Sequence, residues 1–155
     1  MRAGMNAMFD DVRSHCSGAR IDGALVARHV SGGRELIVGA VHDATFGPTV
    51  MVGLGGVFAE ALADVVFRLA PLRREDGRDM LGELRGARLL AGFRGEPPVD
   101  LDAVADVIVN VGDLLVSHPE IVEIDLNPVA ASARGCVALD ARIIVTTAGG
   151  DEAAA

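Results

Sequence analysis

The chain has 155 residues, of which half are apolar, and it carries a formal net charge of −8 at pH 7. This length and composition predict one globular domain with a core of its own and exclude a disordered chain, while the negative charge argues against a nucleic-acid surface. All fourteen basic residues are arginine, which excludes the P-loop and Schiff-base chemistries that need a lysine.

The first half of the chain contains short apolar segments separated by glycine-rich turns. In chain order we expect a weak helix at 5–16 and strands at 23–30, 34–42 and 49–54, with breaks at Ser31–Gly33 and at Gly55–Gly56. The segment 57–70 stays open between helix and strand. Its Ala and Leu residues favour a helix, whereas its Val and Phe residues favour a strand.

Two helices are predicted next, at 75–90 and at 101–117. The first has an apolar stripe, although three glycines weaken it by about 1 kcal/mol each relative to alanine. The second has a cleaner apolar face, and Asp100 is placed to cap its N-terminus. Strands, then helices, then strands predict an α+β fold in which a largely antiparallel sheet carries helices on one face.

Residues 120–145 predict a β-hairpin that closes the fold. Because strand side chains alternate, the polar residues before the turn share one face; they are Glu123, Asp125 and Asn127. If the turn is centred between Ala133 and Arg134, Asn127 and Asp140 become cross-strand partners with Cβ atoms about 5 Å apart. Amide and carboxylate oxygens so placed are typical of a magnesium site. A hairpin whose polar face is merely solvated would show the same spacing.

The turn around Gly53, Gly55 and Gly56 is the second candidate site. Glycines let backbone N–H groups approach either a phosphate or a neighbouring strand closely, and the pattern fits both uses. Glu60 lies just beyond and could reach a cation, or it could be a solvated charge. We expect the turn to lie at the same sheet face as Asn127, with Glu60 directed toward that face.

The ends of the chain and its cysteines bear on domain boundaries and location. We expect an N-terminal segment at 1–20, a body at 21–146 and a disordered tail at 147–155. No apolar stretch predicts a signal peptide or a membrane span. Cys16 and Cys136 fit a reducing cytoplasm better than a disulfide scaffold.

Four stretches in this order carry a family pattern: GRELIVGAVHDATFGPTVMVGLGGVFAEALADVVFRLAPL, LLAGFRGEPPVD, EIDLNP and ALDAR. Together they make residues 24–145 resemble the ATP-grasp region of ADP-forming acyl-CoA synthetases, the relatives of acetate–CoA ligase and succinyl-CoA synthetase. The resemblance implies the second, C-terminal ATP-grasp subdomain. It also implies a reaction that couples acid, CoA and ATP to acyl-CoA, ADP and phosphate through an acyl phosphate and a phosphohistidine.

The resemblance also implies roles for individual residues. Asn127 and Asp140 match magnesium ligands, with Asp125 at the acidic position beside them and Glu35 near the ribose of ATP. The segment 28–31 resembles the hinge whose backbone meets adenine, although Arg28 stands where the family often has an acid.

Two hypotheses for function follow. In the first, the chain is the ATP- and Mg²⁺-binding portion of an acyl-CoA synthetase and is inactive alone. Its partners are then the first ATP-grasp subdomain and a CoA-binding domain, in the same or a separate chain, which carry the contacts with CoA and a small carboxylic acid. In the second, the chain is a non-catalytic nucleotide-binding or regulatory module that remains from such an enzyme. Neither hypothesis includes a nucleic acid or a membrane as a partner.

Overall fold

The computed structural model describes residues 2–56, 64–92, 95 and 97–146. Its helices are α1 (Arg2–His15), α3 (Arg74–Glu83), α4 (Ala87–Leu90) and α5 (Leu101–Ser117). Its strands are β1 (Arg34–Asp43), β2 (Gly47–Leu54), β3 (Val65–Leu69), β4 (Ile121–Ser132), β5 (Gly135–Ala138) and β6 (Ala141–Val145). The strands form one antiparallel sheet in the order β3-β2-β1-β4-β5, and β6 also pairs with β4. The predicted α+β fold is confirmed.

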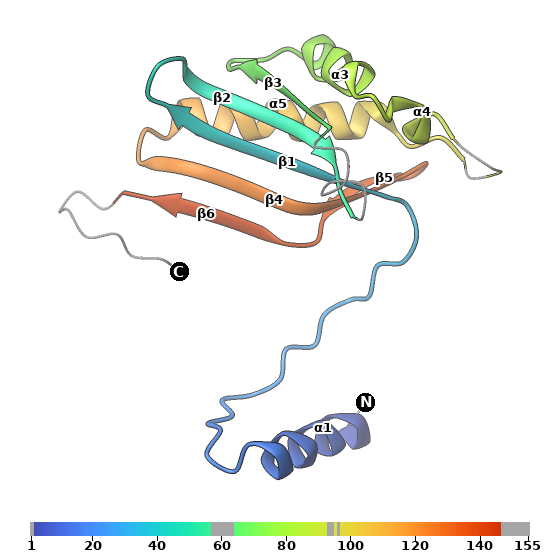
Figure 1. Cartoon of the computed structure of the whole chain (residues 1–155), viewed down its shortest axis with the longest axis vertical. Helices are drawn as coiled ribbons and strands as arrows, with labels where there is room; N and C mark the ends of the chain where they lie inside the picture. Colours follow the sequence, from blue (N-terminus) through green and yellow to red (C-terminus); the bar gives the residue numbers. More distant parts are fainter. Residues whose placement is uncertain (1, 57–63, 93–94, 96, 147–155) are drawn as a thin grey trace.

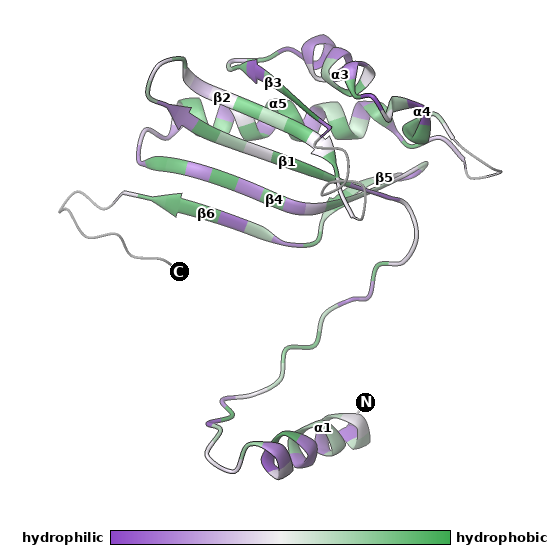
Figure 2. Cartoon of the chain, in the orientation of Figure 1, coloured by the Kyte–Doolittle hydropathy of each residue, from purple (hydrophilic) through white to green (hydrophobic). Residues whose placement is uncertain are grey.

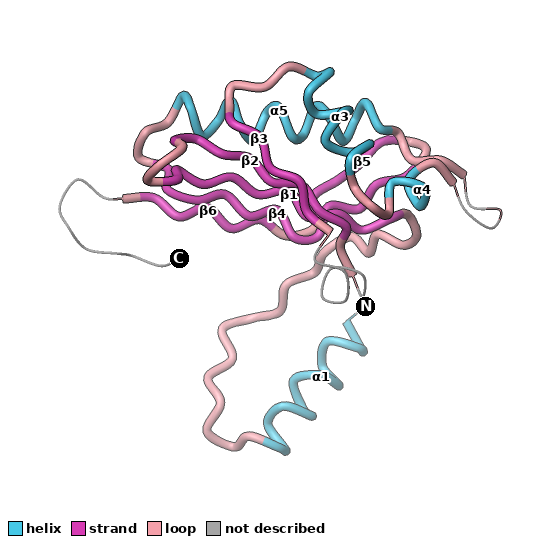
Figure 3. Tube along the Cα trace, turned by 45° about the horizontal axis from the view of Figure 1, so that its top comes forward, coloured by secondary structure: helices cyan, strands magenta, loops and turns pink. Residues whose placement is uncertain are grey.

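Helices α3, α4 and α5 lie on the same face of this sheet (Figure 3). Alternation explains the layering, because Leu36 and Val38 of β1 are fully buried beneath the helices while Glu35, the neighbour of Leu36 on the same strand, is exposed. On α5, Val104, Ile108 and Leu115 are fully buried against the same core. Hydrophobic and hydrophilic residues alternate along β4 (Figure 2), as expected for a strand with only one covered face.

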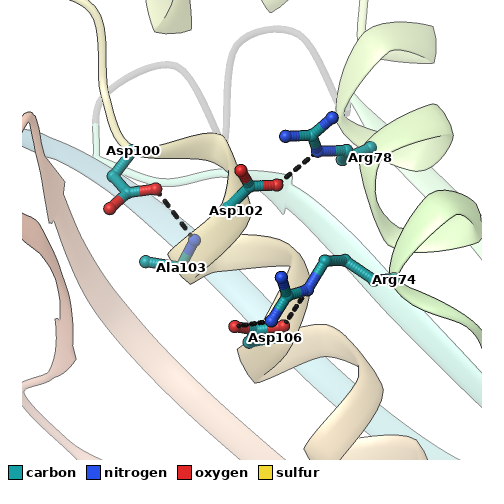
Figure 4. A network of polar contacts seen from close by, with 6 residues as sticks. All are labelled: Arg74, Arg78, Asp100, Asp102, Ala103 and Asp106. Atoms are coloured by element: carbon teal, nitrogen blue, oxygen red, sulfur yellow. Dashed lines mark hydrogen bonds and ion pairs between the residues drawn. The ribbon is translucent and has the colours of Figure 1, made fainter.

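Helices α3 and α5 pack closely and are joined by ion pairs. A Cβ added at Gly77 of α3 would lie 3.1 Å from the carbonyl oxygen of Ala105, so the glycine permits the close approach. Arg74 donates two bonds to the Asp106 carboxylate at 2.5 and 2.6 Å, and Arg78 pairs with Asp102 (Figure 4). As predicted, Asp100 caps α5: its Oδ1 accepts from the backbone N–H of Ala103 at 3.0 Å.

Two predicted elements differ from the structure, and one segment that the sequence left open is partly assigned by it. Residues 23–30 form no strand, because β1 already has β2 and β4 on its two edges and no described strand pairs with this segment. The helix predicted over 75–90 is two helices, broken at Leu84, whose ψ of 134° leaves the helical region. In the open segment, 65–69 form β3, and 57–63 lie outside the described residues. Within the described ranges, no helix is long and apolar enough to cross a membrane.

Candidate functional site

The sheet face opposite α5 carries a shallow hollow of about 400 Å³. Its floor is apolar and includes Ile37, Met51 and Phe67. The polar lining residues are Thr49 of β2 and Glu123, Asp125 and Asn127 of β4. Gly39 has no side chain to fill this hollow, and a Cβ at this position would lie 3.3 Å from the carbonyl oxygen of Ile124. Apolar walls beside convergent oxygen atoms are typical of a small-molecule site.

The closing hairpin has the predicted register. Ser132 pairs with Gly135 across a turn at Ala133 and Arg134, and the backbone N–H of Asn127 donates to the Asp140 carbonyl at 3.3 Å. Asn127 and Asp140 are therefore cross-strand neighbours, as expected.

A β-bulge displaces Asn127 from the ladder with β1. Leu36 pairs with Val129 and Val38 pairs with Leu126, so Asn127 and Pro128 together oppose the single residue Ile37. Proline has no N–H to contribute to a ladder, which makes it compatible with a bulge. Bulges re-aim side chains next to functional sites, and this one coincides with the EIDLNP motif.

Negative charge exceeds positive charge on this part of the sheet. Glu123 forms an ion pair with Arg142 of β6 at 2.5 Å, and Asp140 Oδ1 accepts from the N–H of Ala141 at 2.9 Å. Within the described ranges, the side chains of Asp125 and Asn127 make no hydrogen bond or ion pair, so their oxygens are available to a cation. Hard oxygen donors of this kind suit Mg²⁺ when phosphate oxygens complete its coordination shell.

The described residues do not form a metal-binding cluster by themselves. No three His, Cys, Asp or Glu side chains of that part of the chain come together in the way a metal site requires. A cation here would depend on the amide oxygen of Asn127 and on oxygens that a nucleotide supplies. The donor set therefore fits a metal–nucleotide complex better than a free metal ion.

Glu35, Gly55 and Gly56 line a separate hollow of about 190 Å³ at the end of β2. The N–H of Gly55 donates to the Glu35 carbonyl at 2.7 Å, and a Cβ at Gly55 would lie 3.0 Å from the Glu35 carbonyl carbon. Gly56 has a φ of +66°, and a Cβ there would lie 3.0 Å from Glu35 Oε2. Gly55 thus allows the end of β2 to lie close to β1. Contact of this turn with a phosphate stays a prediction.

A third and larger hollow, of about 810 Å³, lies between residues 28–33 and the β4–β5 hairpin. The hinge predicted from the resemblance lies here, and the lining includes Arg28, Ser132, Arg134 and Cys136. Burial, with a smaller effect of the negative charges of Asp100 and Asp106, raises the pKa of the Cys136 thiol.

Comparison with known proteins identifies the family. An ATP-grasp domain pattern matches residues 1–145. The chain belongs to the ATP-grasp family. Over 144 residues this ATP-grasp chain is 44% identical to subunit beta of acetate–CoA ligase (ADP-forming) I from Pyrococcus furiosus, a match that covers 93% of this chain and 62% of that subunit.

Solved structures of similar proteins agree with this family assignment. A structure of the dinucleotide-forming acetyl-coenzyme A synthetase 1 of Ca. Korarchaeum cryptofilum, in complex with coenzyme A, Ca-AMPCP and HgCl⁺, matches with a TM-score of 0.82 and 44% identity over 94% of this chain and 63% of that one. A second structure of that protein, with coenzyme A and Mg-AMPPCP, matches with a TM-score of 0.72 and 49% identity over 76% of this chain and 55% of that one. The present chain thus spans less than two thirds of each of these relatives.

The predicted site residues of this ATP-grasp chain fall into two groups. Asp125 and Asn127 line the hollow on the open sheet face, and Asp140 is the backbone neighbour of Asn127 across the hairpin, whereas Glu35, Gly55 and Gly56 line the hollow at the end of β2. Gly53 is buried beside Val65 and pairs with Ile37 of β1. Ile37 lines the hollow of about 400 Å³ on the open sheet face. Glu60 lies outside the described residues. The proposed ligand roles stay predictions.

Sequence reasoning missed Asp64, the one charged residue found buried among those described. It is 4% exposed, and its two carboxylate oxygens accept the backbone N–H groups of Arg85 and Gly86, each at 2.8 Å. These bonds satisfy the backbone N–H groups at the break between α3 and α4, next to the hollow that Gly55 and Gly56 line. The DVVFRL pattern offered no signal for this contact, because its two partners lie more than twenty positions away.

Proposed function

We propose that this chain is the ATP- and Mg²⁺-binding portion of an ADP-forming acyl-CoA synthetase. The complete enzyme would convert a carboxylic acid, CoA and ATP to acyl-CoA, ADP and phosphate. The observation that carries the proposal is that Asp125 and Asn127 line the open sheet face and that Asp140 is the backbone neighbour of Asn127 across the hairpin, in a chain that is 44% identical to an acetate–CoA ligase subunit. The relatives solved with Mg-AMPPCP and Ca-AMPCP support the nucleotide and the divalent cation.

In this proposal the oxygens of Asn127 and Asp140 hold Mg²⁺, and Asp125 adds negative charge beside them. Bound Mg²⁺ would supply positive charge that offsets the charge of the phosphates. The Glu35 carboxylate, which is exposed and lies beside Gly56, would accept hydrogen bonds from ribose hydroxyls. The apolar floor formed by Ile37 and Met51 would exclude water from one side of the nucleotide.

The remaining functions belong to partners. Because the chain spans 62% of the Pyrococcus subunit, we propose that the first ATP-grasp subdomain and a CoA-binding domain complete the enzyme. Those parts would bring CoA and the acid. The two free cysteines of the described residues fit an enzyme that works in the reducing cytoplasm.

Calorimetric titration tests the nucleotide proposal. We expect the chain to bind AMPPCP in the presence of Mg²⁺ at least about tenfold more tightly than without it, which corresponds to about 1.4 kcal/mol. Asp140→Ala should remove most of this magnesium effect, because one of the ligands is lost. Asp113→Ala is the matched control, since it removes the same charge from an exposed position on α5.

Two results would contradict the proposal. Binding that is equal with and without Mg²⁺ would show that the acids hold no cation. An equal loss in Asp140→Ala and Asp113→Ala would show that only net charge matters.

A further inference from the structure

Arg142 of β6 places a positive charge on the open face of the sheet. Strand β6 lies beside β4 at the edge of the sheet (Figure 1), and Arg142 is the register partner of Asp125. Side chains of cross-strand partners point to the same face. The guanidinium of Arg142 forms an ion pair at 2.5 Å with Glu123, and both Glu123 and Asp125 line the hollow on that face.

The other basic side chains of the described strands point toward the helices. Arg34 and His42 alternate in phase with the fully buried side chains of β1, and His42 Nε2 lies 3.3 Å from a carbonyl oxygen of α5. Arg68 of β3 forms an ion pair with Glu83 of α3. Among the strand residues that the structure describes, Arg142 is therefore the only basic side chain on the face that carries the candidate magnesium site.

The ion pair that holds Arg142 is accessible to water. The side chain of Arg142 is 57% exposed and that of Glu123 is 37% exposed. An exposed pair of this kind stabilises a fold only slightly, because water and salt screen the two charges. An arginine bonded to a phosphate by two parallel N–H groups makes a stronger contact. Arg142 can therefore exchange Glu123 for a phosphate at little cost.

Arg142 is also close to the place proposed for the magnesium ion. Asn127 and Asp140 are backbone neighbours across the hairpin, and Asp125 with Arg142 forms the cross-strand pair two positions further along the same two segments. Two strand positions correspond to roughly 7 Å. Phosphates that complete the shell of a cation at Asn127 would thus lie within reach of the long side chain of Arg142.

We propose that Arg142 binds the terminal phosphate of a magnesium-bound nucleoside triphosphate. Without nucleotide, Glu123 holds the guanidinium beside Asp125. When the triphosphate binds, its terminal phosphate replaces Glu123 as the partner of Arg142. The residue then distinguishes a triphosphate from a diphosphate, since a diphosphate lacks the group that Arg142 contacts. This assignment rests on the proposed function, because it needs a magnesium nucleotide at Asn127.

Calorimetric titration with two nucleotides tests the assignment. The chain is titrated with Mg-AMPPCP, which carries a third phosphate group, and with Mg-ADP, which does not. We expect Arg142→Gln to weaken binding of Mg-AMPPCP by at least about tenfold and binding of Mg-ADP by less than about threefold. Arg142→Lys keeps the charge but loses the paired N–H groups, so its loss of Mg-AMPPCP binding should be intermediate.

The ion pair on the opposite face provides matched controls. Arg68→Gln and Glu83→Gln make the same charge changes in a strand–helix pair that faces away from the hollow, and they should leave the preference for Mg-AMPPCP over Mg-ADP unchanged. Glu123→Gln releases Arg142, so it should tighten binding of Mg-AMPPCP more than binding of Mg-ADP. This added preference should disappear in the double variant with Arg142→Gln.

Two results would overturn the assignment of Arg142 alone. One is magnesium-dependent binding in which Arg142→Gln weakens both nucleotides equally, since Arg142 would then act only through net charge. The other is a change of preference in Arg68→Gln as large as that in Arg142→Gln. Binding of AMPPCP that does not depend on Mg²⁺ in the unsubstituted chain would overturn the proposed function as well. Urea unfolding of the Arg142 and Arg68 variants, with equal midpoints expected, verifies that the sheet stays folded.

Discussion

Asp64 shows how one side chain can define the path of a distant segment. Its carboxylate accepts two backbone N–H groups where the chain leaves α3 and enters α4. Without this acceptor, the N–H groups of Arg85 and Gly86 would be left without their partner next to the buried side chain of Leu54. A buried donor without a partner destabilises the folded state by about 1–3 kcal/mol.

We predict that Asp64→Asn lowers the free energy of unfolding by roughly 2 kcal/mol. The amide keeps the shape of the side chain, but its NH₂ group meets an N–H where the carboxylate offered an oxygen. Urea unfolding measures the effect as a lower midpoint at unchanged slope. Asp113→Asn, at an exposed position, should stay within about 0.5 kcal/mol of the parent chain. If the two variants unfold at the same midpoint, the buried bonds contribute nothing.

The two thiols should differ in reactivity. Cys16 is exposed, whereas Cys136 is partly buried and its pKa is raised by that burial. A raised pKa keeps Cys136 protonated as pH rises through the ordinary range for a thiol, so less of the reactive thiolate forms. Iodoacetamide at pH 7.5, followed by mass spectrometry, should label Cys16 several-fold faster. Equal labelling rates would contradict the environment described for Cys136.

Among the elements, α3 offers a test of helix packing because it contains two glycines in different surroundings. Gly77 faces Ala105 of α5, and the added Cβ would be within 3.2 Å of three of its atoms, whereas no atom lies within 4 Å of a Cβ at Gly82. We expect Gly82→Ala to raise the free energy of unfolding by up to about 1 kcal/mol through helix propensity. Gly77→Ala should lower it by about 1–3 kcal/mol, because α3 and α5 must move apart. Thermal unfolding of both variants measures the difference, and a gain in both would mean that the helices can separate at no cost.

Elements that are determined by neighbouring residues in the sequence were predictable from it. Alternation located β1, an N-cap located the start of α5, and turn spacing located the register that brings Asn127 opposite Asp140. The prediction of a strand at 23–30 is wrong, because a strand forms only where a second strand pairs with it. The break at Leu84 was missed because the carboxylate that accepts the backbone N–H groups there, that of Asp64, approaches from a distant segment. The candidate site is also split between two hollows lined by different parts of the sheet, which depends on how distant segments are placed in the fold.

At the scale of the whole molecule, charge argues that this chain alone does not catalyse the proposed reaction. A nucleotide triphosphate would meet a protein with a net charge of −8 and no lysine. Phosphoryl transfer normally needs metal ions and cationic side chains around the transferring group. Arg142, which lies opposite Asp125 on the neighbouring strand, is already paired with Glu123. The open sheet face also leaves the phosphates accessible to water, so the benefit of a closed site is lost.

We therefore predict no acyl-CoA formation when the purified chain is incubated with acetate, ATP, CoA and Mg²⁺. Chromatography should detect neither acetyl-CoA nor ADP above the rate of a protein-free control. Sustained formation of both products, abolished by Asp140→Ala and retained by Asp113→Ala, would show that these 155 residues suffice for catalysis.

The pairing of β1 with β4 has a consequence for synthesis of the chain. Strands β1 and β2 are neighbours in sequence, but Val38 pairs with Leu126. Closing so long a loop costs entropy before the ladder can contribute, and such non-local pairing is slow. Until β4 has emerged from the ribosome, one edge of β1 stays unpaired and can pair with strands of other chains. The nascent chain is thus most prone to aggregation in the interval between emergence of β1 and emergence of EIDLNP, the same motif that later supplies Asn127.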